Sequence, residues 1–258
     1  MRVVAGPICA VVAALMAAGC GRNRYDPWLV PEEQFAATVR TIALVSTEMP
    51  QDLEDADPAQ ATVDSLLAAE LRAAGFIVVT PAVTREIWGR LVDSVGGYYD
   101  PFTGRKDTTK YHPVRRAWRR ILRETHGADV ALFPGIIVVD ARVVDWKATW
   151  DGTSQTVEPW GKVVLRVLGA VANGLAGTEP PDPGERTTPA FSLEVQIEHL
   201  DGEVMYVNRG GIEVWARPGG QRVPRSALFQ DMERNVKAVR TALGSSRPVS
   251  ALRIARPD

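Results

Sequence analysis

The sequence predicts an α/β fold: a mixed sheet flanked by helices, with antiparallel hairpins in the C-terminal half. In the first half, short apolar runs alternate with segments whose apolar residues recur at helical spacing, as in parallel strands joined by helices. In the second half, apolar and polar residues alternate beside Asp-Gly pairs, which is typical of hairpins. The content of 45% hydrophobic and 24% charged residues is ordinary for a globular domain.

The elements of the N-terminal half each have a local signal. Asp57, Pro58 and Gln60 form a capping-box start for a helix, and Gly75 is placed to end it. Apolar runs on either side of that helix predict buried strands. In chain order we expect a strand at Thr41–Val45, a loop at Met49–Asp57, the capped helix, a strand at Phe76–Val79, a helix from Thr80 to Val95, a long loop at Gly96–His112 and a helix at Pro113–His126.

The C-terminal half is expected to be mainly antiparallel. Asp129–Val144 is the longest apolar stretch, and its Pro134-Gly135 pair either bends one long strand or divides two. Asp201-Gly202 turns a hairpin whose alternation predicts one face on the core and one in water. The other expected elements are a tight turn at Trp150–Thr153, strands at Phe191–Glu198, Val204–Val207 and Ile212–Trp215, and a helix at Ser226–Leu243 with Leu228, Met232, Val236, Val239 and Leu243 inward.

The amino terminus differs from the rest of the chain. Arg2 is the only charged residue before Cys20, and Ile8–Ala18 is an almost unbroken apolar run. A short positive region, a short apolar region and small residues before a cleavage point mark a secretory signal peptide. The ending Ala17-Ala18-Gly19-Cys20 resembles the lipobox of bacterial lipoproteins, whose cysteine is acylated and becomes the first residue of the mature chain.

This resemblance implies a domain organisation: a signal peptide at 1–19, a lipidated tether at 20–38, a single α/β domain at 39–244 and a loose tail at 245–258. Cys9 would leave with the signal peptide, so Cys20 would be the only cysteine of the mature chain and no internal disulfide could form. Several acyl chains, such as palmitate, on Cys20 would anchor the domain to a membrane. By resemblance to sorting in enteric bacteria, Gly21 favours the outer membrane, with the domain facing the periplasm.

Signatures of catalysis and of cofactor binding are absent from the sequence. It contains no Gly-x-Ser-x-Gly, no His-Glu-x-x-His, no phosphate loop and no dinucleotide fingerprint, and its three histidines are widely separated. A net charge of −1 gives no overall attraction to nucleic acid. We therefore expect a protein that is not an enzyme and that has no cofactor, metal site or nucleic-acid partner. The catalytic alternative is a glycan hydrolase that uses two of Asp100, Asp140 and Asp145 as its paired carboxylates.

Two neighbouring segments form the candidate binding surface. The long loop contains aromatic and cationic residues of the kind enriched at protein interfaces, namely Tyr98, Tyr99, Phe102, Arg105, Lys106, Lys110 and Tyr111. The helix after it has arginines on its expected outer face, namely Arg115, Arg116, Arg119, Arg120 and Arg123. This basic helix is either a solvated face or a contact for anionic lipid head groups or an acidic partner.

The order of the elements resembles a known family. The landmarks are Thr-Ile-Ala-Leu-Val at 41–45, Ala-Gly-Phe-Ile-Val-Val at 74–79, Gly-Ala-Asp-Val-Ala-Leu-Phe-Pro-Gly-Ile at 127–136 and Glu-His-Leu-Asp-Gly-Glu-Val-Met-Tyr at 198–206. Over roughly residues 40–243 the chain resembles the α/β domains of curli-secretion CsgG, the TolB amino-terminal domain, the LpoB activator of peptidoglycan synthases and lipoproteins grouped with CsgG. In that family the domains mostly scaffold, dock or assemble envelope machinery.

The resemblance implies a non-catalytic, lipid-anchored accessory or assembly factor that binds a protein partner in a periplasmic or outer-membrane complex. The alternative is an oligomeric export channel like CsgG, which would make this chain a homo-oligomer with hairpins inserted in the membrane. Only Val143–Val157 and Lys162–Gly177 are candidates for such hairpins, and their alternation is poor. A glycan-acting hydrolase is the third hypothesis.

Overall fold

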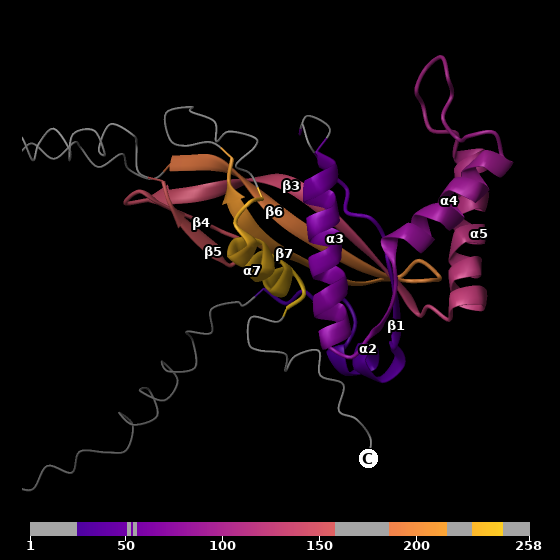
Figure 1. Cartoon of the computed structure of the whole chain (residues 1–258), viewed down its shortest axis with the longest axis horizontal. Helices are drawn as coiled ribbons and strands as arrows, with labels where there is room; N and C mark the ends of the chain where they lie inside the picture. Colours follow the sequence, from indigo (N-terminus) through magenta and orange to yellow (C-terminus); the bar gives the residue numbers. More distant parts are fainter. Residues whose placement is uncertain (1–24, 51–52, 54–55, 158–185, 216–228, 245–258) are drawn as a thin grey trace, which may run out of the picture.

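The structure is a computed structural model that describes residues 25–50, 53, 56–157, 186–215 and 229–244. These residues form the predicted α/β fold, with a mixed seven-stranded sheet flanked by helices (Figure 1). The helices are α2 (Glu32–Thr38), α3 (Ala56–Ala73), α4 (Pro81–Ser94), α5 (Thr108–His126) and α7 (Met232–Ala242). The strands are β1 (Thr41–Leu44), β2 (Ile77–Val79), β3 (Val130–Val144), β4 (Lys147–Trp150), β5 (Thr153–Thr156), β6 (Arg186–His199) and β7 (Val204–Val214).

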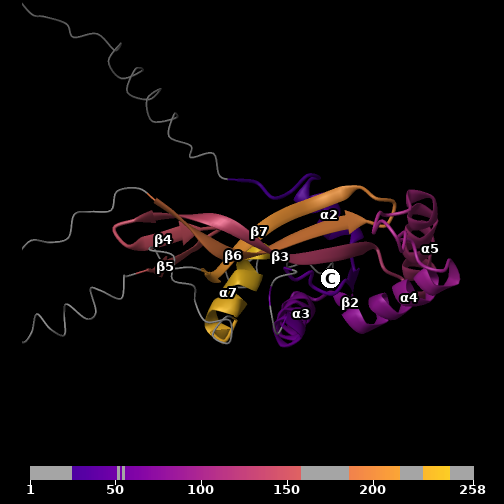
Figure 2. The ribbon, with the colours of Figure 1, turned by 90° about the horizontal axis from the view of Figure 1, so that it is seen from above.

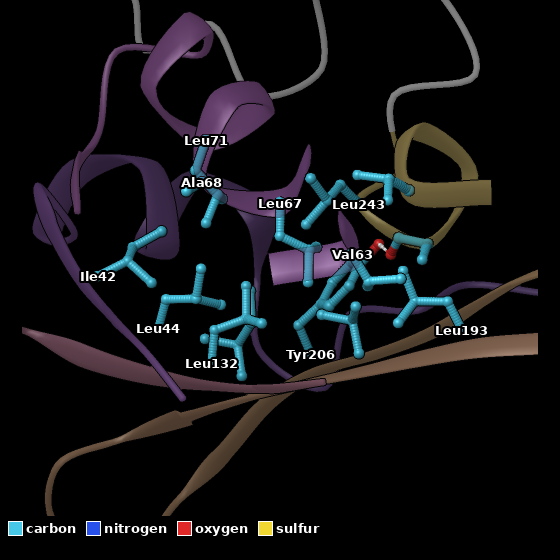
Figure 3. Packing of buried hydrophobic residues seen from close by; sticks show 14 of the residues in the cluster. Ile42, Leu44, Val63, Leu67, Ala68, Leu71, Leu132, Leu193, Tyr206 and Leu243 are labelled. Carbon is cyan, nitrogen blue, oxygen red and sulfur yellow. Dashed lines mark hydrogen bonds between the residues drawn. The ribbon is translucent and has the colours of Figure 1, made fainter. Parts of the chain in front are cut away.

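Strand β1 lies between β2 and β3 and is parallel to both. Helix α3 connects β1 to β2, and α4 and α5 together connect β2 to β3. Helices α3 and α7 lie on the same side of the sheet (Figure 2). Leu67 and Leu71 of α3 pack there with Ile42 of β1, Leu132 of β3 and Leu243 (Figure 3). A second core, on α4 and α5, joins Ile87, Trp118 and Leu122 to Ala43 and Ala131 of the sheet. The two cores place helices on both faces of the parallel strands.

Strand β3 is continuous, so Pro134-Gly135 does not divide it. It pairs antiparallel with β6 along almost its whole length, from Val130↔His199 to Val143↔Arg186. Strand β7 pairs with β6 and is also one strand, so the two return strands expected at Val204–Val207 and Ile212–Trp215 are joined. The hairpin of β4 and β5 curls back against β7, where the Gly211 backbone N–H donates to the Asp151 carbonyl at 2.9 Å.

Two tight turns define this hairpin. The turn predicted at Trp150–Thr153 is confirmed, with positive φ at both Asp151 (33°) and Gly152 (73°), as two-residue hairpin loops require. A second turn at Asp145 and Trp146, also with positive φ, joins β3 to β4, and no Gly signalled it.

The hairpin packs on the domain through its buried face. Ala148 is fully buried and Trp150 is almost so, and the Trp150 indole N–H donates to the Phe191 carbonyl at 3.1 Å. Val143–Val157, a candidate for a membrane hairpin, is therefore part of the folded domain in this structure. The other candidate, Lys162–Gly177, lies outside the described residues. The described part of the chain contains no helix that is both long and apolar enough to cross a membrane.

The described end of the expected tether belongs to the domain. The Trp28 ring lies 4.7 Å from the Tyr206 ring and 4.9 Å from the Phe35 ring. The Leu29 backbone N–H donates to the Met205 carbonyl at 2.9 Å. Isolated aromatic residues without periodicity gave no sign of this packing in the sequence. Cys20 and the signal peptide lie outside the described residues.

Three predicted helix starts are corrected. Helix α7 begins at Met232 instead of about Ser226, because the Asp231 carboxylate caps it by accepting from the Arg234 backbone N–H at 3.1 Å. Ser226 and Leu228 lie outside the described residues. Helix α5 begins at Thr108 instead of Pro113, because the Asp107 carboxylate caps it by accepting from the Thr109 backbone N–H at 2.9 Å. Tyr111 and His112 are therefore helical and the loop is shorter than predicted. Helix α3 begins at Ala56 and so already includes Asp57, the predicted cap, and the Gln60 side-chain amide donates to the Thr47 carbonyl at 2.6 Å.

Two predicted burial patterns are also corrected. The outer face of β6 is not all in water, since Ser192 and Glu198 are buried. In α7, Met232 is exposed, while Asn235 is buried because its side-chain amide donates to the Phe229 carbonyl at 2.7 Å. The other buried residues at this helix are Ala238, Val239, Ala242 and Leu243, whose mostly small side chains allow close packing on β7.

Glu213 makes stability depend on pH. Burial raises the pKa of this β7 carboxyl above its ordinary value of 4.5, although it accepts a hydrogen bond from the Phe229 backbone N–H. The folded state then binds more protons than the unfolded state between the two pKa values, so we expect stability to fall as pH rises from 4.5 through the raised pKa. Urea unfolding of the native chain and of Glu213→Gln between pH 4 and 8 would measure this. The free energy of unfolding of Glu213→Gln should fall less over this pH range than that of the native chain. The same pH dependence in both proteins would contradict the prediction.

Candidate protein-binding site

The loop between α4 and α5 is held in a defined turn by its own backbone. Tyr99 and Lys106 pair as an antiparallel bridge. At the turn, the Asp100 carboxylate accepts from the backbone N–H of Thr103 at 2.9 Å and of Phe102 at 2.8 Å. These hydrogen bonds favour the charged carboxylate and lower the pKa of Asp100 below its ordinary 3.8. The turn fixes the conformation in which the tip of the loop meets solvent.

Phe102 stands at this tip and is 96% exposed. Arg105 and Lys106 follow it and are also exposed. Burying a phenylalanine side chain is worth about 1.5–3 kcal/mol relative to leaving it in water. A surface that covered the Phe102 ring would gain this free energy, and the fixed turn lowers the entropic cost of ordering the loop on binding.

Beneath the tip, aromatic rings attach the loop to the helices. The Trp88 ring centroid lies 5.9 Å from Tyr98, 6.0 Å from Tyr111 and 6.0 Å from Trp118, each in an edge-on arrangement. Tyr98 also contacts Tyr99 at 4.8 Å between centroids. Burial raises the pKa of the Tyr98 phenol above its ordinary value of 10.0. Trp88 is the centre of this aromatic cluster, which we define as Trp88, Tyr98, Tyr99, Tyr111 and Trp118.

A hollow of about 350 Å³ adjoins the aromatic cluster. It lies where β1 ends, between the sheet and helices α4 and α5, and is lined by Val45, Ser46, Thr84, Arg85, Trp88, Tyr111, Arg115, Trp118 and Phe133. The Trp118 indole N–H donates to the Thr84 carbonyl at 3.1 Å, which fixes the back wall. Most of the lining is apolar, and it also includes the cationic residues Arg85 and Arg115.

The five arginines of α5 do not share one solvated face, which corrects the sequence interpretation. Arg115 and Arg119 both bind the buried Glu198 carboxylate, with nitrogen–oxygen distances of 2.7 and 2.6 Å. Gln196 donates a further hydrogen bond to Glu198 at 2.8 Å. The exposed arginines are Arg116, Arg120 and Arg123. Of the five α5 arginines, these three are the ones that an acidic partner or a lipid head group on the outer surface would meet.

The structure brings together part of the predicted site. Tyr98, Tyr99 and Tyr111 meet in the aromatic cluster, and Arg115 joins Tyr111 in the lining of the hollow. Phe102 and Arg105 lie out on the loop, and Arg116, Arg120 and Arg123 are spread along α5. We define the candidate docking surface as these loop and α5 residues, namely Tyr98, Tyr99, Phe102, Arg105, Tyr111, Arg115, Arg116, Arg120 and Arg123.

Sequence reasoning missed three partners of this surface. Trp88 and Arg85 lie on α4, and Glu198 lies on β6. The three-residue spacing of Arg85 and Trp88 placed them on one side of a helix, but nothing in the sequence said which side faced the loop. The contact between Lys106 and Tyr111 had a clearer signal in the sequence, because the two residues lie close together in the chain. In the structure the Lys106 ammonium is 3.6 Å from the Tyr111 ring centroid.

The described residues contain no group of three His, Cys, Asp or Glu side chains that could hold a metal ion. Two of the aspartates weighed for glycan hydrolysis lie far apart: Asp100 is in the α4–α5 loop and Asp145 is in the β3–β4 turn, at opposite ends of the molecule (Figure 1). They cannot form a pair of carboxylates on one glycosidic bond.

Comparison with known proteins yields little. The chain matches no protein-family model and no curated protein. Among solved structures it is similar to a PelC dodecamer from Paraburkholderia phytofirmans, at 13% sequence identity and a TM-score of 0.28, over 78% of this chain and 90% of that one. A likeness at this level carries no argument about function.

Proposed function

We propose that this protein is a non-catalytic accessory or assembly factor of the bacterial cell envelope that binds a partner protein through the candidate docking surface. A lipid on Cys20 would hold it at the outer membrane, facing the periplasm. The cleavage pattern that ends at Cys20 supports the anchor. The alternative of an export channel with inserted hairpins gains no support from Val143–Val157, which packs on the domain.

The observation that carries the proposal is the exposed Phe102 on a turn fixed by Asp100, above the aromatic cluster. Large aromatic side chains held outside the core on ordered backbone are typical of protein interfaces, where a few such anchors supply most of the binding free energy. Exposed arginines and Lys106 surround the same end of the molecule and suit the rim of an interface. No other described aromatic side chain is as exposed as Phe102.

A site-specific crosslink tests this proposal. A photoreactive phenylalanine analogue is placed at position 102 of the full chain in its own membrane, and adducts are identified by mass spectrometry. We expect a stoichiometric adduct with a different envelope protein. Tyr98 is a poor position for this test, because its ring packs in the aromatic cluster and a change there would also perturb the fold.

The matched control is the same analogue at Leu29, which is 62% exposed but lies against β7, away from the loop. Position 29 should give no adduct with the partner. Absence of any adduct from position 102 would contradict the proposal. An adduct only with a second copy of this chain would favour the oligomeric channel instead.

A further inference from the structure

The hollow lies beside the carboxyl end of β1, on the face of the sheet that α4 and α5 cover. Val45 and Ser46 directly follow β1, and Phe133 lies in the neighbouring β3. In open α/β sheets, ligands bind outside the carboxyl ends of the strands. The hollow therefore adjoins a strand end of the kind at which ligands bind.

The walls suit a planar apolar group. Trp88, Trp118 and Phe133 form much of the lining, and the Trp88 and Trp118 rings stand at 87° to each other. A volume of about 350 Å³ exceeds the cavity of about 150 Å³ that holds benzene in an engineered protein. By volume, the hollow can therefore admit one aromatic side chain.

The polar side of the hollow is cationic. The Arg85 guanidinium donates to the Ser46 hydroxyl at 2.6 Å, and in the described part of the chain no carboxylate lies within ion-pair distance of it. One terminal nitrogen of Arg115 donates to both carboxylate oxygens of Glu198, and Arg119 donates to the same carboxylate. One carboxylate thus faces two guanidinium groups, and a ligand carboxylate at Arg85 would meet an uncompensated positive charge.

We infer that the hollow receives an aromatic side chain flanked by carboxylates, so that the partner presents an acidic segment with an aromatic residue at its centre. This inference rests on the proposed function and names the chemistry of the partner. It favours a peptide over a free small acid because the hollow is continuous with the loop: Tyr111 lines the hollow and also contacts Tyr98 and Lys106. A chain that fills the hollow would extend over this surface.

The probe is a blocked peptide with the sequence Gly-Asp-Phe-Asp-Gly, titrated into the folded protein while the indole N–H signals are followed by NMR. We expect saturable shifts of the Trp88 and Trp118 signals. Peptides with Asn in place of Asp, or Ala in place of Phe, should bind at least about tenfold more weakly, because a charge-assisted hydrogen bond or the buried ring is lost. Equal binding of the Asn peptide would overturn the assignment.

Arg85→Gln should weaken the acidic peptide about tenfold, since it removes the charge of an exposed side chain and leaves the core intact. Arg90→Gln is the matched control on the same helix, because Arg90 is exposed and pairs with Glu86, and it should leave the affinity unchanged. A weakening by Arg90→Gln equal to that by Arg85→Gln would mean that general charge, and not the hollow, attracts the peptide, and would refute the inference.

3-Phenylpropionate separates a peptide from a free acid. If it binds as tightly as the peptide, the hollow takes a small carboxylate and the peptide assignment is wrong.

The outcome of the crosslink at position 102 separates this inference from the proposed function. A partner adduct there without peptide binding refutes the chemistry given for the hollow alone. Peptide binding without an adduct refutes the loop as the docking element and leaves the hollow as the site.

Discussion

Gly210→Ala is expected to destabilise the domain by about 3 kcal/mol. Strand β7 passes so close under α7 that a Cβ at this position would lie 2.0 Å from the Ala238 carbonyl oxygen and 3.0 Å from the Ala242 backbone nitrogen. These neighbours are backbone atoms of a helix, which cannot turn away as a flexible side chain can. The helix must lift from β7, and the buried contacts of Val239 and Leu243 are loosened as it does.

Urea unfolding followed by circular dichroism measures this effect. The control is Gly89→Ala in α4, where a Cβ would have no atom within 4 Å. Alanine should stabilise that helix by up to about 1 kcal/mol, because it restricts the unfolded chain and favours helical backbone. If Gly210→Ala unfolded at the same urea concentration as the native chain, the close approach of α7 to β7 would be wrong.

Glu198→Ala is expected to cost about 3 kcal/mol of stability. The carboxylate is 9% exposed and accepts hydrogen bonds from Arg115, Arg119 and Gln196. Its removal leaves two arginine side chains, 32% and 16% exposed, without their anion at the junction of α5 and β6. The partial exposure of Arg115 places the cost at the lower end of the range for breaking buried ion pairs, since water can solvate that guanidinium.

The control for this loss is Glu194→Ala on the same strand. Glu194 pairs with Arg209 at 2.6 Å, but the two side chains are 31% and 47% exposed, so the pair should contribute less than about 1 kcal/mol. Urea denaturation of both variants gives the comparison. A loss from Glu198→Ala no greater than that from Glu194→Ala would show that Glu198 does not hold α5 on the sheet.

The sequence by itself determined the kind and order of most elements in the described chain; the exceptions are α2, which lies in the predicted tether, and β7, which was predicted as two strands. Helical spacing of apolar residues predicted α3, α4 and most of α5, and the two Asp-Gly pairs predicted the turns at Gly152 and Gly202. These signals are local, because a turn or an amphipathic helix depends on residues a few positions apart. The loop that contains Phe102 was likewise predicted from its own composition.

Only the tertiary structure decided which polar side chains are buried and which surface is hollow. Arg115 and Glu198 are 83 residues apart in sequence, so the arginine periodicity of α5 could not show that two of its arginines face a carboxylate on β6. The hollow is likewise built by β1, β3, α4 and α5 together. Burial and charge pairing depend on which distant elements are brought into contact. Local sequence patterns do not show these contacts, because they involve residues that are far apart in the chain.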